Sequence, residues 1–106
     1  MTTYLVTRHS GALDWLRAQG FTDVVPVPHL DPAQVTAGDS VVGTLPVHLA
    51  AEICARGGRY YHLSLDLPPQ ARGRELSAAD LDRYAARVEQ YRVHAAAGTA
   101  VPEALL

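Results

Sequence analysis

Cysteine is almost missing from this 106-residue sequence, and Cys54 stands alone, so no disulfide can form within the chain. A secreted scaffold held together by disulfides is therefore excluded. No apolar stretch is long enough to span a membrane, and no signal-peptide pattern opens the chain, so we expect a cytoplasmic protein that meets no membrane. The formal net charge is only −2. A broad basic surface for a long nucleic acid is thus not expected, which leaves room for a small anion held by a few local residues.

The familiar motifs of nucleotide binding and hydrolysis are also missing. The sequence contains no Walker motif and no G-x-G-x-x-G, H-E-x-x-H or G-x-S-x-G pattern. His48 and Glu52 are four residues apart on a predicted helix, as two metal ligands would be, but no third ligand accompanies them. We therefore predict a protein without a bound metal and without another cofactor.

A chain of this length forms one domain with a substantial core. Short β-type runs alternate with helical runs, and this pattern predicts an α/β fold. Strands are expected at residues 4–7, 24–27, 40–43 and 60–65, and helices at residues 12–19, 46–56 and 78–94. We assign the domain to residues 1–94. Residues 95–106 are rich in alanine and are broken by Gly98 and Pro102, so we expect a flexible or partner-docking tail there.

The alternation also predicts how the strands are arranged. Right-handed crossovers give a parallel sheet covered by helices on both faces, with the expected strand order 2-1-3-4. Pro26 favours an edge position for the second strand, because proline cannot donate to a ladder. The continuous apolar pair Val41-Val42 suits a third strand that is buried on both faces. The sequence therefore predicts a small Rossmann-like domain with a four-stranded, mainly parallel sheet.

The stretch from Val42 to Glu52 is the connection that we expect to matter most for function. The third strand stops at Gly43, and Pro46 suits the first turn of the helix that follows. Thr44 is a candidate cap for the amides ahead of it. A helix N-terminus with free amides and a positive dipole end suits a phosphate. The alternative is an ordinary strand-to-helix connection.

Ligands of such sheets bind beyond the carboxyl ends of the strands, where the strand order reverses, here between the first and third strands. Arginine offers paired donors to phosphate oxygens, and histidine can transfer a proton near neutral pH. We predict catalytic roles for three residues that follow the first strand, Arg8, His9 and Ser10. The predicted ligand-binding residues come from the loops that follow the first, third and fourth strands. They are Gly11, Thr44, Leu45, Pro46, Ser64, Arg72 and Arg74.

Several of these residues have purely structural alternatives. Arg8 could pair with Asp14, and His9 could be a capped loop histidine. Ser10 is a plausible cap for the first helix, a role that is compatible with catalysis.

The later candidates have alternatives as well. Arg72 and Arg74 could simply lie in a solvated loop. His62 alternates with apolar neighbours on the fourth strand, so we interpret it as structural.

Three blocks together resemble a family of small CRISPR-associated proteins encoded with type III systems. They are T-T-Y-L-V-T-R-H-S-G-A, G-T-L-P-V-H-L-A-A-E-I-C-A-R-G and H-L-S-L-D-L-P-P-Q-A-R-G-R-E-L-S, and the resemblance covers about residues 2–93. Members are regarded as stand-alone ring nucleases whose fold is related to the sensor domains called CARF domains. The resemblance implies a CARF-like, three-layer domain that cleaves cyclic tetra-adenylate and so switches off type III CRISPR signalling.

The chemistry of this ligand adds further expectations. A symmetric ring suits a pocket on the two-fold axis of a homodimer. RNA carries its own nucleophile, the 2′-hydroxyl, so cleavage needs alignment and charge stabilisation rather than a metal. The expected products are linear oligoadenylates with 2′,3′-cyclic phosphate ends. Two alternatives stay open, namely a protein that sequesters the ring without cutting it, and an interaction module that binds no nucleotide.

Overall fold

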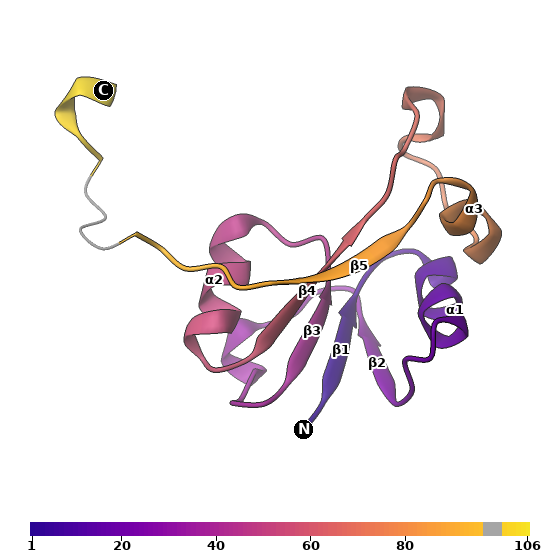
Figure 1. The fold of residues 1–106 in the computed structure, drawn as a ribbon, viewed down its shortest axis with the longest axis horizontal. Helices are drawn as coiled ribbons and strands as arrows, with labels where there is room; N and C mark the ends of the chain where they lie inside the picture. The colour runs from indigo at the N-terminus through magenta and orange to yellow at the C-terminus, as the bar shows by residue number, and fades with distance from the viewer. Residues whose placement is uncertain (97–100) are drawn as a thin grey trace.

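The computed structural model describes residues 1–96 and 101–106 of the chain. Five strands and three helices follow in the order β1 (Thr3–Val6), α1 (Ser10–Ala18), β2 (Val24–Val27), β3 (Ser40–Gly43), α2 (Val47–Ala55), β4 (Arg59–Ser64), α3 (Ala78–Arg83) and β5 (Arg87–Tyr91) (Figure 1). Single 3-10 turns lie at Pro32–Gln34, Pro69–Ala71 and Glu103–Leu105. The predicted alternation of strands and helices is confirmed as far as β4.

The strands form one sheet in the order β2-β1-β3-β4-β5. The four strands predicted from the sequence pair in parallel, and β5 pairs antiparallel with β4. The predicted order 2-1-3-4 is therefore confirmed, and Pro26 does lie on an edge strand. The predicted number of four strands is wrong, because β5 adds a fifth.

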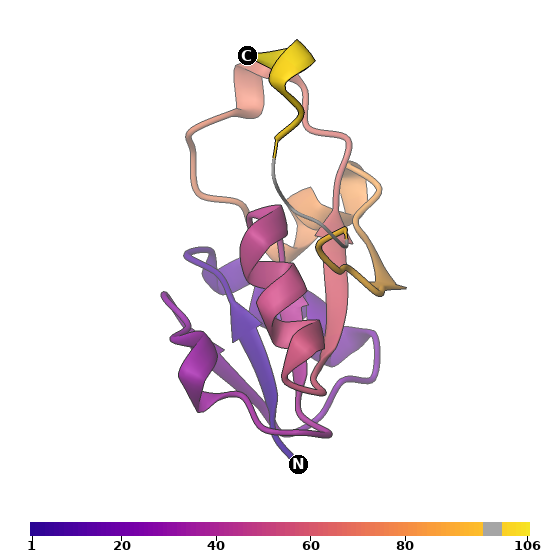
Figure 2. The ribbon, with the colours of Figure 1, turned by 90° about the vertical axis from the view of Figure 1, so that its left-hand side faces the viewer.

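Helices cover both faces of the sheet, so the predicted three-layer α/β class is confirmed. Figures 1 and 2 show the strands between α1 on one side and α2 on the other. Val41 and Val42 are successive residues of β3 that point to opposite faces, and both are fully buried. This strand is thus buried on both sides, as its apolar pair predicts.

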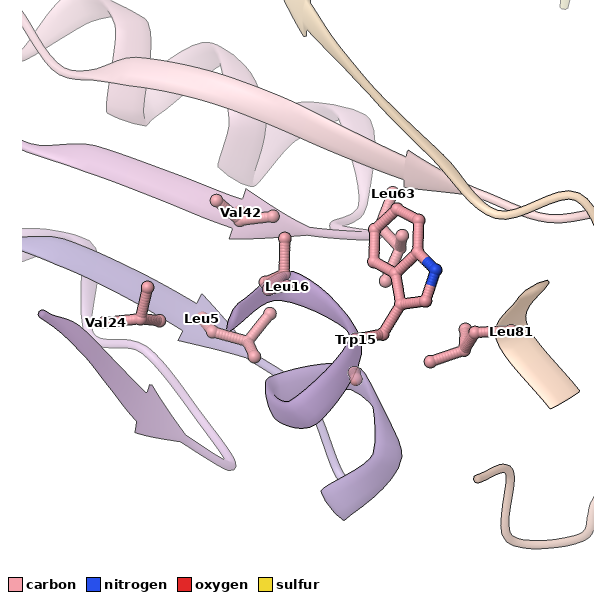
Figure 3. Packing of buried hydrophobic residues seen from close by; sticks show 8 residues of the cluster. Leu5, Trp15, Leu16, Val24, Val42, Leu63 and Leu81 are labelled. Atoms are coloured by element: carbon pink, nitrogen blue, oxygen red, sulfur yellow. The ribbon is translucent and has the colours of Figure 1, made fainter. Parts of the chain in front are cut away.

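The main hydrophobic core lies between the sheet and the pair α1 and α3. Trp15 and Leu16 of α1 pack against Leu5 and Val42 of the sheet, and Leu81 of α3 closes the cluster (Figure 3). The indole Nε1 of Trp15 also donates a hydrogen bond of 2.9 Å to Asp82 Oδ1. This bond ties α1 to α3, which places the loop before α3 beside the start of α1.

The last predicted helix, residues 78–94, is wrong, because α3 ends at Arg83. A capping box of Ser77 and Asp80 starts the helix. At its end Ala85 adopts the left-handed φ of 56°, and Ala86 N–H bonds Leu81 O at 2.9 Å. These features close the helix by a Schellman motif, a role that glycine usually fills.

The segment after this turn becomes a strand because β4 would otherwise leave its outer edge unpaired. Register partners run from Tyr60 with Tyr91 to Ser64 with Arg87. Unpaired strand edges are costly and prone to association, so pairing outweighs helix propensity here.

No helix among the described residues is long and apolar enough to cross a membrane. Of the predicted tail, residues 97–100 lie outside the described part of the chain. Leu105 and Leu106 are exposed at its end. Its partner-docking role stays a prediction.

Candidate functional site

A cleft of about 650 Å³ lies at the carboxyl ends of β1, β3 and β4, whose arrowheads end on the same side in Figure 1. It is at the reversal of strand order, where the sequence predicts a ligand site. Its walls are formed by Val6, Thr7, Arg8, His9, Ala12, Pro28, Thr44, His62, Leu63, Ser64, Leu65, Leu67, Leu76 and Leu81. Four of the predicted site residues therefore come together here, namely Arg8, His9, Thr44 and Ser64.

The cleft combines two kinds of surface. One arginine, two histidines and three hydroxyl side chains supply hydrogen-bond donors, while leucines dominate the apolar part. No lining residue is a carboxylate, although the whole chain carries a net negative charge. Such a cleft favours a ligand that is anionic at one end and flat and apolar at the other.

His9 is held at the entrance to α1 by local hydrogen bonds. Its backbone N–H donates to Thr7 Oγ1 at 3.0 Å, and its ring Nδ1 accepts from Leu76 N–H at 3.3 Å. Glu75 Oε2 lies 3.8 Å from the same ring nitrogen, too far for a hydrogen bond. Because Nδ1 accepts a hydrogen bond, the neutral ring carries its proton on Nε2.

Ser10 does not have the role of helix cap that the sequence predicts. His9 occupies the N-cap position of α1, and no side chain caps the helix locally. Instead Glu75 Oε1 accepts a hydrogen bond of 3.2 Å from the Ser10 amide. A carboxylate therefore sits at a helix N-terminus, a position that also suits a phosphate. The Ser10 side chain is exposed and does not line the cleft.

Gly11 is buried against the segment that precedes α3, outside the cleft lining. A Cβ at this position would lie 2.3 Å from Leu76 O and 2.5 Å from the carbonyl carbon of Ser77. Gly11 thus allows α1 and this segment to touch, which brings Leu76 to His9.

Arg8 lines the cleft with an exposed side chain. Among the residues that the structure describes, no ion pair engages it, so the predicted alternative of a pair with Asp14 is not observed. It also borders a smaller adjoining cavity of about 390 Å³. A guanidinium without a carboxylate partner is available to an anionic ligand.

The loop between β3 and α2 differs in detail from its prediction. Thr44 Oγ1 donates a hydrogen bond to Leu63 O, so the predicted capping role of Thr44 is wrong. Pro46 takes the N-cap position, and no side chain caps α2. Leu45 and Pro46 line the adjoining cavity beside Arg8 instead of the cleft itself.

The two arginines of the loop after β4 are placed apart from the cleft. Arg72 and Arg74 are both exposed, and neither lines the cleft walls. Arg74 Nη2 donates to Tyr84 Oη at 3.4 Å. Their role as ligand contacts stays a prediction that would require the loop to move.

His62 is the site residue that the sequence analysis missed, because strand alternation favoured a structural role. It lines the cleft, and its Nδ1 lies 2.6 Å from Tyr60 Oη. Tyr60 is buried, and this burial raises the pKa of its phenol above the ordinary value of 10.0. The usable signal was position, since His62 lies at the carboxyl end of a strand, two residues before Ser64.

Metal ligands do not gather among residues 1–96 and 101–106, where no group of three or more His, Cys, Asp or Glu side chains could hold an ion. Glu52, predicted as one half of a possible pair with His48, is bonded to Arg56 at 3.1 Å. Glu52 and Arg56 thus form an i,i+4 ion pair, with the glutamate on the N-terminal side, which is the favourable order.

Comparison with known proteins identifies the family of this chain. No curated protein and no solved structure matches the chain. The family model described as "Putative CRISPR-associated protein (Cas_VVA1548)" matches residues 4–94. The matched range contains the whole sheet except Thr3 and every residue of the cleft lining. The chain therefore belongs to this family of CRISPR-associated proteins.

Proposed function

We propose that the protein is a ring nuclease that cleaves cyclic tetra-adenylate to linear oligoadenylates with 2′,3′-cyclic phosphate ends. Cleavage of this second messenger would switch off type III CRISPR signalling. The observation that carries the proposal is the cleft at the strand-order reversal, which joins Arg8 and His9 to hydroxyl and leucine side chains without a carboxylate. Membership of a CRISPR-associated family supplies the biological context.

The two surfaces of the cleft match the two parts of an adenylate. Arg8, Thr44 and Ser64 offer donors to phosphate oxygens, and the leucine side chains offer an apolar wall to a purine. The uncapped N-terminus of α2 adds free amides at the same end of the sheet. The three-layer Rossmann-like fold also supports the relation to CARF domains that the sequence blocks imply.

The size of the cleft supports a homodimer. A volume of about 650 Å³ is within the range for one drug-sized ligand. A ring of four adenylates is larger than that, so one cleft would hold only part of it. Two copies facing each other across a two-fold axis would offer the same loops to both halves of the ring.

The reaction needs no nucleophile from the protein. The 2′-hydroxyl of the ligand attacks the adjacent phosphorus, and Arg8 stabilises the negative charge that develops on the phosphate oxygens. His9 faces the cleft with a proton on Nε2. Bound phosphates favour the charged imidazolium, and Glu75 near Nδ1 can then accept the second N–H after a small shift. His9 would protonate the leaving 5′-oxygen.

The direct test is incubation of the purified protein with cyclic tetra-adenylate in the presence of EDTA, followed by chromatography of the products. We expect a linear product with a 2′,3′-cyclic phosphate end. His9→Ala should lower the single-turnover rate about 10²–10⁴-fold and leave binding largely intact. The matched control is His48→Ala, which removes an exposed histidine of α2 outside the cleft.

A second measurement separates cleavage from binding alone. Arg8→Ala should weaken binding of cyclic tetra-adenylate by about 1.5–3 kcal/mol in calorimetric titration, as expected for a charged hydrogen bond to phosphate. Tight binding by the unmodified protein without any cleavage would establish the sequestering alternative. The absence of both binding and cleavage would overturn the proposal.

A further inference from the structure

His62 has contacts that no step of the proposed reaction described above involves. It lies near the carboxyl end of β4 and lines both the cleft and an adjoining cavity of about 350 Å³. Its side chain is half-buried. A histidine that is merely structural needs no opening to a cleft.

The ring of His62 is fixed in orientation from two sides. Its centroid lies 5.7 Å from that of Tyr60 and 5.9 Å from that of Tyr91, both in edge-on packing. Its Nδ1 is 2.6 Å from Tyr60 Oη. Edge-on aromatic contacts and a short hydrogen bond together leave the ring little freedom. The described residues provide no hydrogen-bond partner for Nε2.

The surroundings of the Tyr60 hydroxyl determine which nitrogen of His62 carries the proton. Leu45 N–H donates to Tyr60 Oη at 3.0 Å, and the hydroxyl itself donates to Gly43 O at 3.2 Å. The phenol has only one proton. When the hydroxyl donates that proton to Gly43 O, the hydrogen bond of 2.6 Å between Tyr60 Oη and His62 Nδ1 must be donated by His62 Nδ1–H. This arrangement satisfies all three contacts, whereas a hydroxyl that donated to His62 could not also donate to Gly43 O.

Burial keeps the phenol protonated, as this arrangement requires. Tyr60 is 2 % exposed, and burial raises the pKa of its phenol, so the hydroxyl keeps its proton at neutral pH. A neutral phenol anchored at Gly43 and Leu45 presents a lone pair to His62. The neutral imidazole then has a bare Nε2, which is the form that can accept a proton.

His9 and His62 are therefore in opposite tautomeric states in the same cleft. The contact with Leu76 N–H leaves the proton of His9 on Nε2, and the contact with Tyr60 leaves Nε2 of His62 free. The two rings therefore present different groups to the cleft, a donating Nε2–H on His9 and an accepting Nε2 on His62.

We propose that His62 is the general base of the ring-opening reaction and that Tyr60 is its positioning residue. This inference rests on the proposed nuclease function. His62 Nε2 takes the proton of the 2′-hydroxyl while O2′ forms its bond to phosphorus. The bond from phosphorus to the 5′-oxygen breaks, and that oxygen takes a proton from Nε2 of the His9 imidazolium, which becomes the neutral ring with Nδ1 protonated. The products are a 2′,3′-cyclic phosphate and a 5′-hydroxyl, and both histidines return to their starting states by exchange with solvent.

Other groups near His62 bear on its titration. Glu89 of β5 is its cross-strand partner, and Tyr60 and Tyr91 flank the ring. Arg8 and His9 line the same cleft. The pH profile must therefore be compared between variants and not interpreted from one curve.

The test measures single-turnover cleavage of cyclic tetra-adenylate as a function of pH for the unmodified protein, His62→Gln and Tyr60→Phe. We expect a bell-shaped profile for the unmodified protein. His62→Gln should lose about 10²–10⁴-fold in rate and should lose the rise on the acidic side, with unchanged affinity for the ring. Tyr60→Phe keeps the imidazole but not its partner, so the acidic side should shift with a smaller loss in rate. The matched control is His48→Gln, which should behave as the unmodified protein.

The outcomes separate this inference from the function on which it rests. Cleavage by His62→Gln within a few-fold of the unmodified rate would overturn the inference and leave the nuclease function standing. A loss of rate with the profile unchanged and the affinity lowered would also overturn it, because His62 would then act in binding. An unmodified protein that cleaves nothing would overturn both. Nitrogen NMR of the His62 ring adds a readout free of activity, in which protonated Nδ1 and bare Nε2 are expected.

Discussion

The sequence predicts that Gly11 contacts the ligand, whereas the structure gives it a role in packing. A substitution at Gly11 distinguishes the two roles. In Gly11→Ala the new Cβ would be 2.3 Å from Leu76 O, whereas ordinary contacts begin at 3.4 Å. Backbone atoms of Ser77 and Ala78 lie almost as near, so no flexible side chain can move aside. Helix α1 and this segment must separate by about 1 Å, and overpacking of this kind costs about 1–3 kcal/mol of stability.

The assay is urea unfolding of Gly11→Ala beside Ser10→Ala. The control changes the neighbouring exposed residue, whose side chain caps nothing, so its stability should stay within about 0.5 kcal/mol of the unmodified protein. Separation of the segments also pulls Leu76 N–H from His9, so the cleavage rate of Gly11→Ala should fall together with stability. A variant as stable as the unmodified protein that nevertheless binds no ligand would refute the packing argument. It would instead support the close ligand approach predicted from the sequence.

Three further predictions concern acid stability, a helix end and assembly. Hydrogen bonds from the Thr36 and Thr2 amides lower the pKa of Asp39 below its ordinary 3.8, so its stabilisation is present above that value and is lost as pH falls through the folded pKa. Asp39→Asn should flatten this acid-side loss in pH-dependent thermal unfolding, and an unchanged slope would contradict the assignment. Ala85→Gly should raise stability by about 0.5–1 kcal/mol, because glycine adopts the left-handed backbone of Ala85 without strain, and equal or lower stability in urea would argue against strain there. Light scattering at micromolar concentration should give the mass of a homodimer, and a strictly monomeric mass with and without ligand would rule out the shared pocket.

The sequence was sufficient for the parallel part of the fold because each element there carries its own local signal. Val41 and Val42 mark a strand buried on both faces, and Pro26 marks an edge. Gly20 follows the C-cap of α1 with a φ of +100°, a left-handed backbone that glycine commonly adopts at a helix end. Right-handed crossovers then leave few ways to order four parallel strands.

The antiparallel strand β5 could not be predicted in the same way. Leu81, Tyr84 and Val88 recur at helical spacing, and no glycine or proline interrupts them. The helix nevertheless ends at a left-handed alanine, and the following residues pair with β4. The deciding factor is the free-energy cost of leaving the edge of β4 unpaired. Because β4 is distant in sequence, no local sequence pattern reveals this cost.

In the candidate site too, some features follow from the local sequence and others from tertiary contacts. The loop positions of Arg8 and His9 follow from strand ends and topology, so the place of the site was predictable. The protonation state of a histidine is different, because it depends on which groups other segments bring to the ring. Leu76, distant from His9 in sequence, leaves the His9 proton on Nε2, whereas a phenol anchored by the loop after β3 holds the proton of His62 on Nδ1. An imidazole that alternates with apolar neighbours on a strand gives no sign of such a partner. The assignment of an acid and a base within this cleft therefore depends on the tertiary structure, and the pH profiles of His62→Gln and Tyr60→Phe test that assignment directly.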